Sequence, residues 1–159
     1  MKKILAIDIG GPIIQRPAHS SLDEYRAAEP VANSFATLNT LSYLFKENIH
    51  LISQCNQDLQ DVKIDWMQRH NFHILTNIPL DRVHFVREPH QKALLAEELQ
   101  ATHFVEDRAE ILNYALLRVD HLYLFRPNVE EASKYPLLLR HADIVINWDA
   151  LFYRIDRTL

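Results

Sequence analysis

Residues 3–12 read KILAIDIGGP, an apolar run that ends at Asp8 and is followed closely by two adjacent glycines. The run at residues 4–7 is short and bounded by polar residues, which is typical of a buried β-strand. Gly10 and Gly11 are the only glycines of the chain, so they indicate a place where the backbone takes an unusual course. The sequence therefore predicts a buried first strand that ends in a turn carrying a carboxylate.

Outward from this strand, short apolar runs alternate with longer amphipathic segments. Such alternation favours an α/β fold: a three-layer sandwich with a mainly parallel, doubly wound sheet and helices on both faces. The further strands are expected at residues 49–52, 83–86, 102–105, 122–125 and 144–146. The helices are expected at residues 31–46, 58–70, 91–99, 109–117 and 130–140.

Local signals refine two of these helices. Asn56 precedes residues 58–70 and is a plausible N-cap, because its side chain can accept from a free backbone N–H. In residues 91–99 the helical spacing predicts that Leu94, Leu95 and Leu99 face inward. The C-terminal run at residues 148–153 is apolar and could dock on a second subunit, which leaves a homo-oligomer open.

Length and charge limit the classes of protein. A chain of 159 residues suits one domain, residues 1–159, with a substantial core. The net charge is -4 and no block of Lys or Arg stands out, so neither nucleic acid nor an anionic membrane is an expected partner. The apolar start stops at Asp8, too early for a signal core, and the single cysteine, Cys55, excludes an internal disulfide. These features favour a cytoplasmic protein.

Residues 14–29 interrupt the alternation between strand and helix. Within them, Ser21 and Glu24 have the spacing of a capping box that opens a short helix. The segment is too short for a separate domain. We expect a small insertion above the edge of the sheet where the strands end.

Polar residues follow several of the predicted strands. Asp8 follows the first and Ser53 the second, Glu106 and Asp107 follow the fourth, and Lys92 lies in the helix before it. Parallel strands with right-handed crossovers end at the same edge of a sheet, so these side chains are expected to converge. Carboxylate oxygens suit Mg²⁺, and a lysine and a metal together neutralise a phosphoryl group. An aspartate can attack phosphorus and form an aspartyl-phosphate.

At these positions the chain resembles the phosphatases of the haloacid dehalogenase (HAD) superfamily, in a branch with a small cap. Their motifs match DIGGP at residues 8–12, HLIS at residues 50–53, EPHQKA at residues 88–93 and HFVEDR at residues 103–108. The four motifs occur in the order and spacing of the family, over roughly residues 2–126. The resemblance implies a Rossmann-like, HAD-like sheet and Mg²⁺ as cofactor.

The resemblance also implies a role for each residue. Asp8 would be the nucleophile and a metal ligand, with the backbone carbonyl of Gly10 and the side chain of Asp107 as further ligands. Glu106 would be a nearer or a water-mediated partner of the metal. The remaining two residues, Ser53 and Lys92, would hold the phosphoryl oxygens of a phosphorylated substrate or ligand.

One departure from the family pattern bears on turnover. The phosphatases have a second aspartate, which serves as general acid and base, where this chain has Gly10, and Pro12 replaces their usual threonine. General acid–base groups contribute typically ~10²–10⁴-fold to a rate. Two hypotheses follow. In the first, the chain is a phosphohydrolase whose activity is impaired, unless His19, Asp23 or Glu24 of the insertion replaces the missing acid. In the second, it is a degenerate domain that binds a phosphorylated ligand or a protein partner without turnover.

Overall fold

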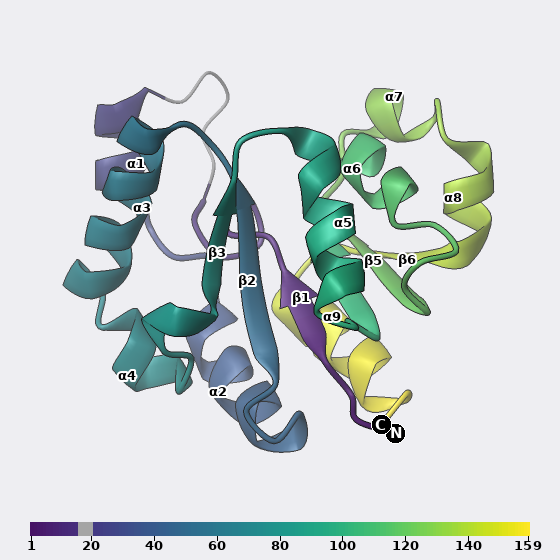
Figure 1. Ribbon diagram of the computed structural model, residues 1–159, viewed down its shortest axis with the longest axis horizontal. Helices are drawn as coiled ribbons and strands as arrows, with labels where there is room; N and C mark the ends of the chain where they lie inside the picture. The colour runs from purple at the N-terminus through teal and green to yellow at the C-terminus, as the bar shows by residue number, and fades with distance from the viewer. Residues whose placement is uncertain (16–20) are drawn as a thin grey trace.

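The computed structural model describes residues 1–15 and 21–159. Over these residues, six parallel strands form one sheet in the order β3-β2-β1-β4-β5-β6 (Figure 1). The strands are β1 (Leu5–Ile7), β2 (Ile49–Gln54), β3 (Val83–Val86), β4 (His103–Glu106), β5 (His121–Phe125) and β6 (Ala142–Val145). The predicted fold class is confirmed.

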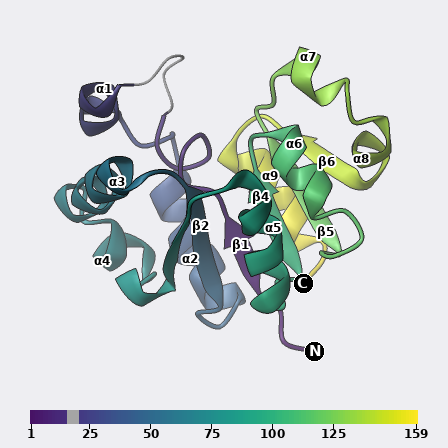
Figure 2. The ribbon, with the colours of Figure 1, turned by 45° about the horizontal axis from the view of Figure 1, so that its top comes forward.

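Helices cover both faces of this sheet, as Figures 1 and 2 show. The alternation along β1 separates the two cores: Leu5 and Ile7 pack on one side and Ala6 on the other. The first side is covered by α2 (Ser34–Leu44), α3 (Gln57–Arg69), α4 (Phe72–Thr76) and α9 (Trp148–Asp156). The second is covered by α5 (Pro89–Glu98), α6 (Ala109–Tyr114), α7 (Val129–Ala132) and α8 (Pro136–His141). A 3₁₀ turn at Leu80–Arg82 precedes β3.

The register brings the ends of β1 and β4 together. Ile7 lies opposite Leu51 of β2 and Val105 of β4. The backbone N–H of Asp8 donates to the carbonyl of Val105 at 2.9 Å, so the pairing continues to the aspartate. The strand order runs outward from β1 on one side and from β4 on the other, so the direction of winding changes between these two strands. In open α/β sheets, ligands bind at such a switch point.

Where the structure describes the insertion, at residues 14–15 and 21–29, it contains the short helix α1 (Leu22–Ala27). Ser21 caps this helix, and Glu24 completes the predicted capping box. In both views α1 lies beside α3 (Figures 1 and 2). Within the described residues, no helix has the length and apolar character needed to span a membrane.

Three expectations need correction. The helix expected at residues 130–140 is two short helices, because α8 begins at Pro136, which lacks the N–H that a continuous helix would use. Leu94 is 43% exposed and does not face inward. Of the run at residues 148–153, Trp148 and Leu151 are buried in the core of the chain itself, so they are not available to a second subunit, whereas Tyr153 is exposed.

Candidate functional site

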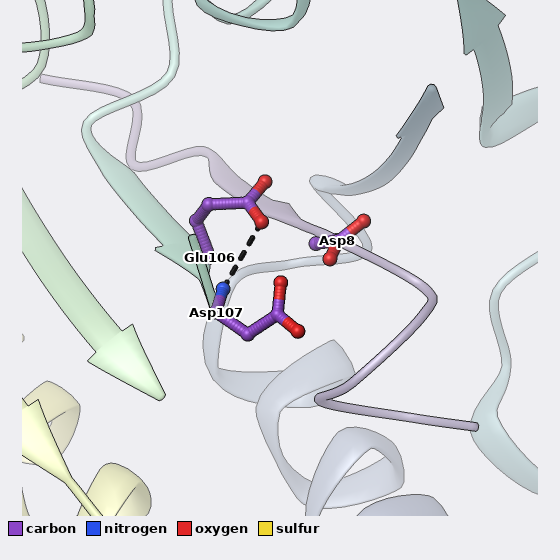
Figure 3. Close-up of side chains that lie close together, drawn as sticks. All are labelled: Asp8, Glu106 and Asp107. Atoms are coloured by element: carbon purple, nitrogen blue, oxygen red, sulfur yellow. Dashed lines mark hydrogen bonds between the residues drawn. The ribbon is translucent and has the colours of Figure 1, made fainter. Parts of the chain in front are cut away.

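Three carboxylates lie together at the switch point between β1 and β4. Asp8 follows β1, Glu106 ends β4 and Asp107 comes next, with ligand oxygens within 4.8 Å of one another. Figure 3 shows the three side chains gathered from these two neighbouring strands. Asp8 and Glu106 are buried, and Asp107 is largely so. Hard carboxylate oxygens in this number suit a divalent cation of the Mg²⁺ type.

Lys92 joins two of these acids by direct ion pairs. Its ammonium group donates to Asp8 Oδ1 at 2.7 Å and to Glu106 Oε2 at 2.5 Å. The lysine comes from α5, which packs over β2 and β3, and its side chain is 2% exposed. The convergence of Asp8, Lys92, Glu106 and Asp107 is the arrangement expected from the sequence.

Glu106 has further hydrogen bonds that fix its carboxylate. Its Oε1 accepts from the backbone N–H of Asp107 at 3.0 Å, shown dashed in Figure 3, and from that of Arg108 at 3.2 Å. Because Oε2 accepts from Lys92, both carboxylate oxygens of Glu106 are held by hydrogen bonds within the site. This geometry suits a residue that positions Lys92 and the chain after β4.

The electrostatics of the cluster follow from burial and crowding. Burial opposes ionisation of Asp8, but the ammonium groups of Lys92 and Lys63 hold its pKa below the usual value. Burial, together with the charges of Asp8 and Glu106, raises the pKa of Asp107 to about 10. Burial and Asp8 also raise the pKa of Glu106. The cluster therefore carries more potential negative charge than Lys92 balances, which is the condition that favours a bound cation.

Gly11 lies in contact with the cluster, and its backbone conformation requires a glycine. Its φ is +108°, and a Cβ at this position would lie 2.3 Å from Asp107 Oδ2. At Gly10, by contrast, the nearest atom to a Cβ would be Tyr25 Oη at 3.5 Å, an ordinary contact. The contacts and the backbone conformation therefore require a glycine at position 11 but not at position 10.

Substitution of the two glycines should reveal this difference as a difference in stability. Gly11→Ala is expected to lower the free energy of unfolding by about 1–3 kcal/mol, from backbone strain and displacement of Asp107. Gly10→Ala serves as the matched control and should stay within about 1 kcal/mol of the parent. Urea unfolding at equilibrium measures both. Equal stability of the two variants would contradict the described contact between Gly11 and Asp107.

Lys63 is a second buried lysine at this site, and the sequence analysis missed it. Its ammonium group donates to Ser53 Oγ at 2.7 Å and lies 5.4 Å from the centre of the Tyr25 ring. It is 3% exposed. The signal that could have found it is its position in α3, on the stripe with Val62, Trp66 and Met67 that is otherwise apolar and faces inward.

A cavity of about 480 Å³ opens beside Asp8, a size ordinary for a small-molecule site. Cations and acids line it together. Its wall includes Asp8, Gly10, Tyr25, Cys55, Lys63, Lys92, Glu106 and Arg108. Burial raises the pKa of the Cys55 thiol, so this cysteine is poorly suited to act as a nucleophile.

The remaining predicted residues take different positions. Ser53 is fully buried and lies behind Lys63, which forms the cavity wall at that point. Asp23 pairs with Arg26 on the exposed face of α1, Glu24 completes the capping box, and neither is among the residues that line the cavity. His19 lies outside the described residues. The carbonyl of Pro12 accepts from Trp148 Nε1 at 2.7 Å, which anchors the turn after β1 to α9.

Comparison with known proteins gives the fold a class. No family model matches the sequence, and no curated protein matches it. Solved structures of sugar-phosphate phosphatases do match, over nearly the whole chain. The fold is therefore that of these phosphatases.

Three of these structures illustrate the likeness. A D,D-heptose 1,7-bisphosphate phosphatase from B. bronchiseptica, complexed with magnesium and phosphate, gives a TM-score of 0.74 at 14% identity, over 99% of both chains. The enzyme of the same name from Burkholderia thailandensis gives 0.57 at 15% identity, over 97% of this chain and 98% of that one. A cobalt-bound deoxy-D-mannose-octulosonate 8-phosphate phosphatase from Haemophilus influenzae gives a TM-score of 0.57 at 11% identity, over 96% of this chain and 86% of that one.

Proposed function

We propose that the chain is a Mg²⁺-dependent phosphohydrolase of the HAD superfamily, with a small cap, and that Asp8 is its nucleophile. The observation that carries the proposal is the placement of Asp8. It lies at the switch point of the sheet, is held by Lys92 at 2.7 Å, and shares a cluster with Glu106 and Asp107. The fold shared with phosphatases, one of them complexed with magnesium and phosphate, supports it.

The donor set fits a magnesium ion. Asp8 and Asp107 would supply side-chain oxygens and Gly10 its backbone carbonyl, as the family pattern implies. Glu106, whose oxygens accept from Lys92 and from two backbone N–H groups, would act at the metal indirectly. Bound Mg²⁺ would neutralise charge on the phosphoryl oxygens and on the crowded carboxylates.

We propose the following roles for the residues of the site. The lowered pKa keeps Asp8 ionised, so that its carboxylate can attack the phosphorus of a phosphorylated substrate. Lys92 orients that carboxylate and offers its charge to the phosphoryl oxygens. Ser53 was expected to hold a phosphoryl oxygen; because it is buried behind Lys63, we propose that it acts through that lysine, by fixing its ammonium group at the cavity wall.

The proposal is tested by phosphate release from a panel of phosphorylated small molecules, with Mg²⁺ and with a chelator in its place. The panel should include acyl, aryl, sugar and alkyl phosphates, because the substrate class is open at this stage. We expect release from at least one class with Mg²⁺ and little release after chelation. Absence of release from every class, in protein shown to be folded, would overturn the proposal.

A domain that binds a phosphorylated ligand or a protein partner without turnover is the second candidate. The observation that favours it is Gly10, which supplies no proton where the phosphatases have an aspartate. Gly10→Asp separates the two candidates, since the ordinary contacts around the glycine leave room for a side chain. Phosphate release that appears only in this variant would identify the natural protein as a binder.

A further inference from the structure

We propose that Lys63 stands in for the missing acid by holding the leaving-group oxygen as an anion, and that the substrates are therefore phosphates with acidic leaving groups, such as acyl phosphates. The inference rests on the proposed function, since it concerns the same cavity and the same attack by Asp8. It adds a residue and a substrate class that neither the motifs nor the phosphatase-like fold supplies.

The position of Lys63 is the first observation. A side chain at residue 10 would project toward Tyr25 Oη, at 3.5 Å from the Cβ, and toward Lys63 Nζ, at 3.7 Å. The place where the phosphatases carry their second aspartate is therefore next to an ammonium group in this chain. Lys63 and Gly10 both line the cavity that contains Asp8, so the ammonium group is within the volume a substrate would occupy.

The second observation is that Lys63 is built into the wall and held there. Its side chain is buried on α3, its ammonium group bonds Ser53 Oγ at 2.7 Å, and the Tyr25 ring of α1 lies against it. Burying an ammonium group is costly, and such groups concentrate at sites that use their charge. A fixed cation in a partly enclosed cavity stabilises developing negative charge more strongly than one in water.

A lysine and an aspartic acid differ in what they give to a leaving group. Efficient proton donors have an affinity for protons matched to the working pH, whereas a lysine ammonium group ordinarily keeps its proton at neutral pH. Lys63, whose ammonium group is fixed by Ser53 at the cavity wall, is placed to stabilise an anion that forms there. Charge stabilisation alone is not enough for an alkoxide, which must be protonated as it departs. A carboxylate or a phenolate, which leaves as a stable anion, would be served well.

The chemistry balances without an acid for such substrates. In the first step the Asp8 carboxylate forms a bond to phosphorus, the bond from phosphorus to the leaving oxygen breaks, and the electron pair departs with a carboxylate. In the second step water attacks the aspartyl-phosphate, the bond from phosphorus to Asp8 breaks, and both protons of the water leave with the phosphate as H₂PO₄⁻.

Leaving-group dependence tests the inference in the full-length protein with Mg²⁺. We measure kcat/KM for acetyl phosphate, for a series of substituted phenyl phosphates and for glycerol phosphate, each corrected for spontaneous hydrolysis. Acetyl phosphate and nitrophenyl phosphate should exceed glycerol phosphate by about 10²-fold or more, the contribution of a missing general acid. Gly10→Asp should reduce this difference by raising the rate for glycerol phosphate.

Variants of the lysine assign the effect to its charge. Lys63→Met should lower kcat/KM for acetyl phosphate by roughly 10²-fold, as for loss of one oxyanion-stabilising group. Lys63→Arg should restore part of that loss. Lys134→Met removes an exposed lysine and is the matched control. Calorimetry with vanadate, as a readout apart from activity, should show weaker binding to Lys63→Met.

The outcomes distinguish this inference from the proposed function. Turnover that requires Asp8 but is equal for acyl and alkyl phosphates would overturn the inference and leave the function standing. The same holds if Lys63→Met retains full activity, or if the exposed control Lys134→Met loses as much as Lys63→Met does. Turnover that does not require Asp8 would overturn the proposed function itself.

Discussion

Replacing Asp8 with asparagine is expected to lower the rate of Mg²⁺-dependent phosphate release by roughly 10⁴-fold or more, as for loss of a nucleophile in other enzymes. The amide cannot form the acyl-phosphate bond that the proposed function requires. Its shape is nearly that of the acid, and its carbonyl can still accept from Lys92, so the site should keep its packing. The fall should therefore appear in kcat, with thermal unfolding little changed.

The control for this variant is Asp120→Asn, which removes an exposed carboxylate before β5. Both proteins are assayed on the best substrate of the panel, with Mg²⁺ in excess. We expect Asp120→Asn to match the parent. If Asp8→Asn retains the activity of the parent, any phosphatase activity of the chain arises elsewhere and the assignment of the nucleophile is wrong.

Replacing Lys92 with methionine is expected to cost about 3–5 kcal/mol of unfolding free energy at neutral pH without metal, the usual result of removing one partner of a buried ion pair. Methionine keeps much of the apolar stem of the lysine. The loss therefore reports on the two carboxylates, Asp8 and Glu106, which would stay buried without the ammonium group that bonds both.

The pH dependence gives this prediction a sign. Lys92 helps to hold the pKa of Asp8 below its usual value, so its contribution to stability is present above the pKa of an unfolded aspartate and is lost as the pH falls. The difference in unfolding free energy between the parent and Lys92→Met should accordingly become smaller as the pH is lowered. Urea unfolding at several pH values measures it, with Lys134→Met as control. A difference below about 1 kcal/mol at neutral pH would mean that the pair resembles an exposed one.

Much of the site could be predicted from sequence because four of its residues are tied to strand ends. Asp8 and Asp107 follow neighbouring parallel strands, and the register of β1 with β4 then brings them together. Lys92 could be predicted because of its fixed spacing before β4. In each case a local sequence pattern placed the residue relative to a strand, and the order of the strands in the sheet then brought the residues into contact.

Lys63 and Tyr25 could not be predicted in the same way. Their contribution depends on how α1 packs beside α3 and on how both helices lie over the turn at Gly10. No strand end marks either residue. Gly10 could be recognised as a missing acid, but what lies beside it is a property of packing. The helix break before Pro136, in contrast, could have been predicted from the sequence, because proline is common at the first position of a helix.

A crystal structure with Mg²⁺ and fluoroberyllate, a mimic of a phosphoryl group, tests the central claim most directly. We expect beryllium bonded to a carboxylate oxygen of Asp8, the metal on Asp8 and Asp107, and the fluorines near Lys92. Fluoroberyllate bound away from Asp8, with the ion pair between Asp8 and Lys92 unchanged, would contradict it.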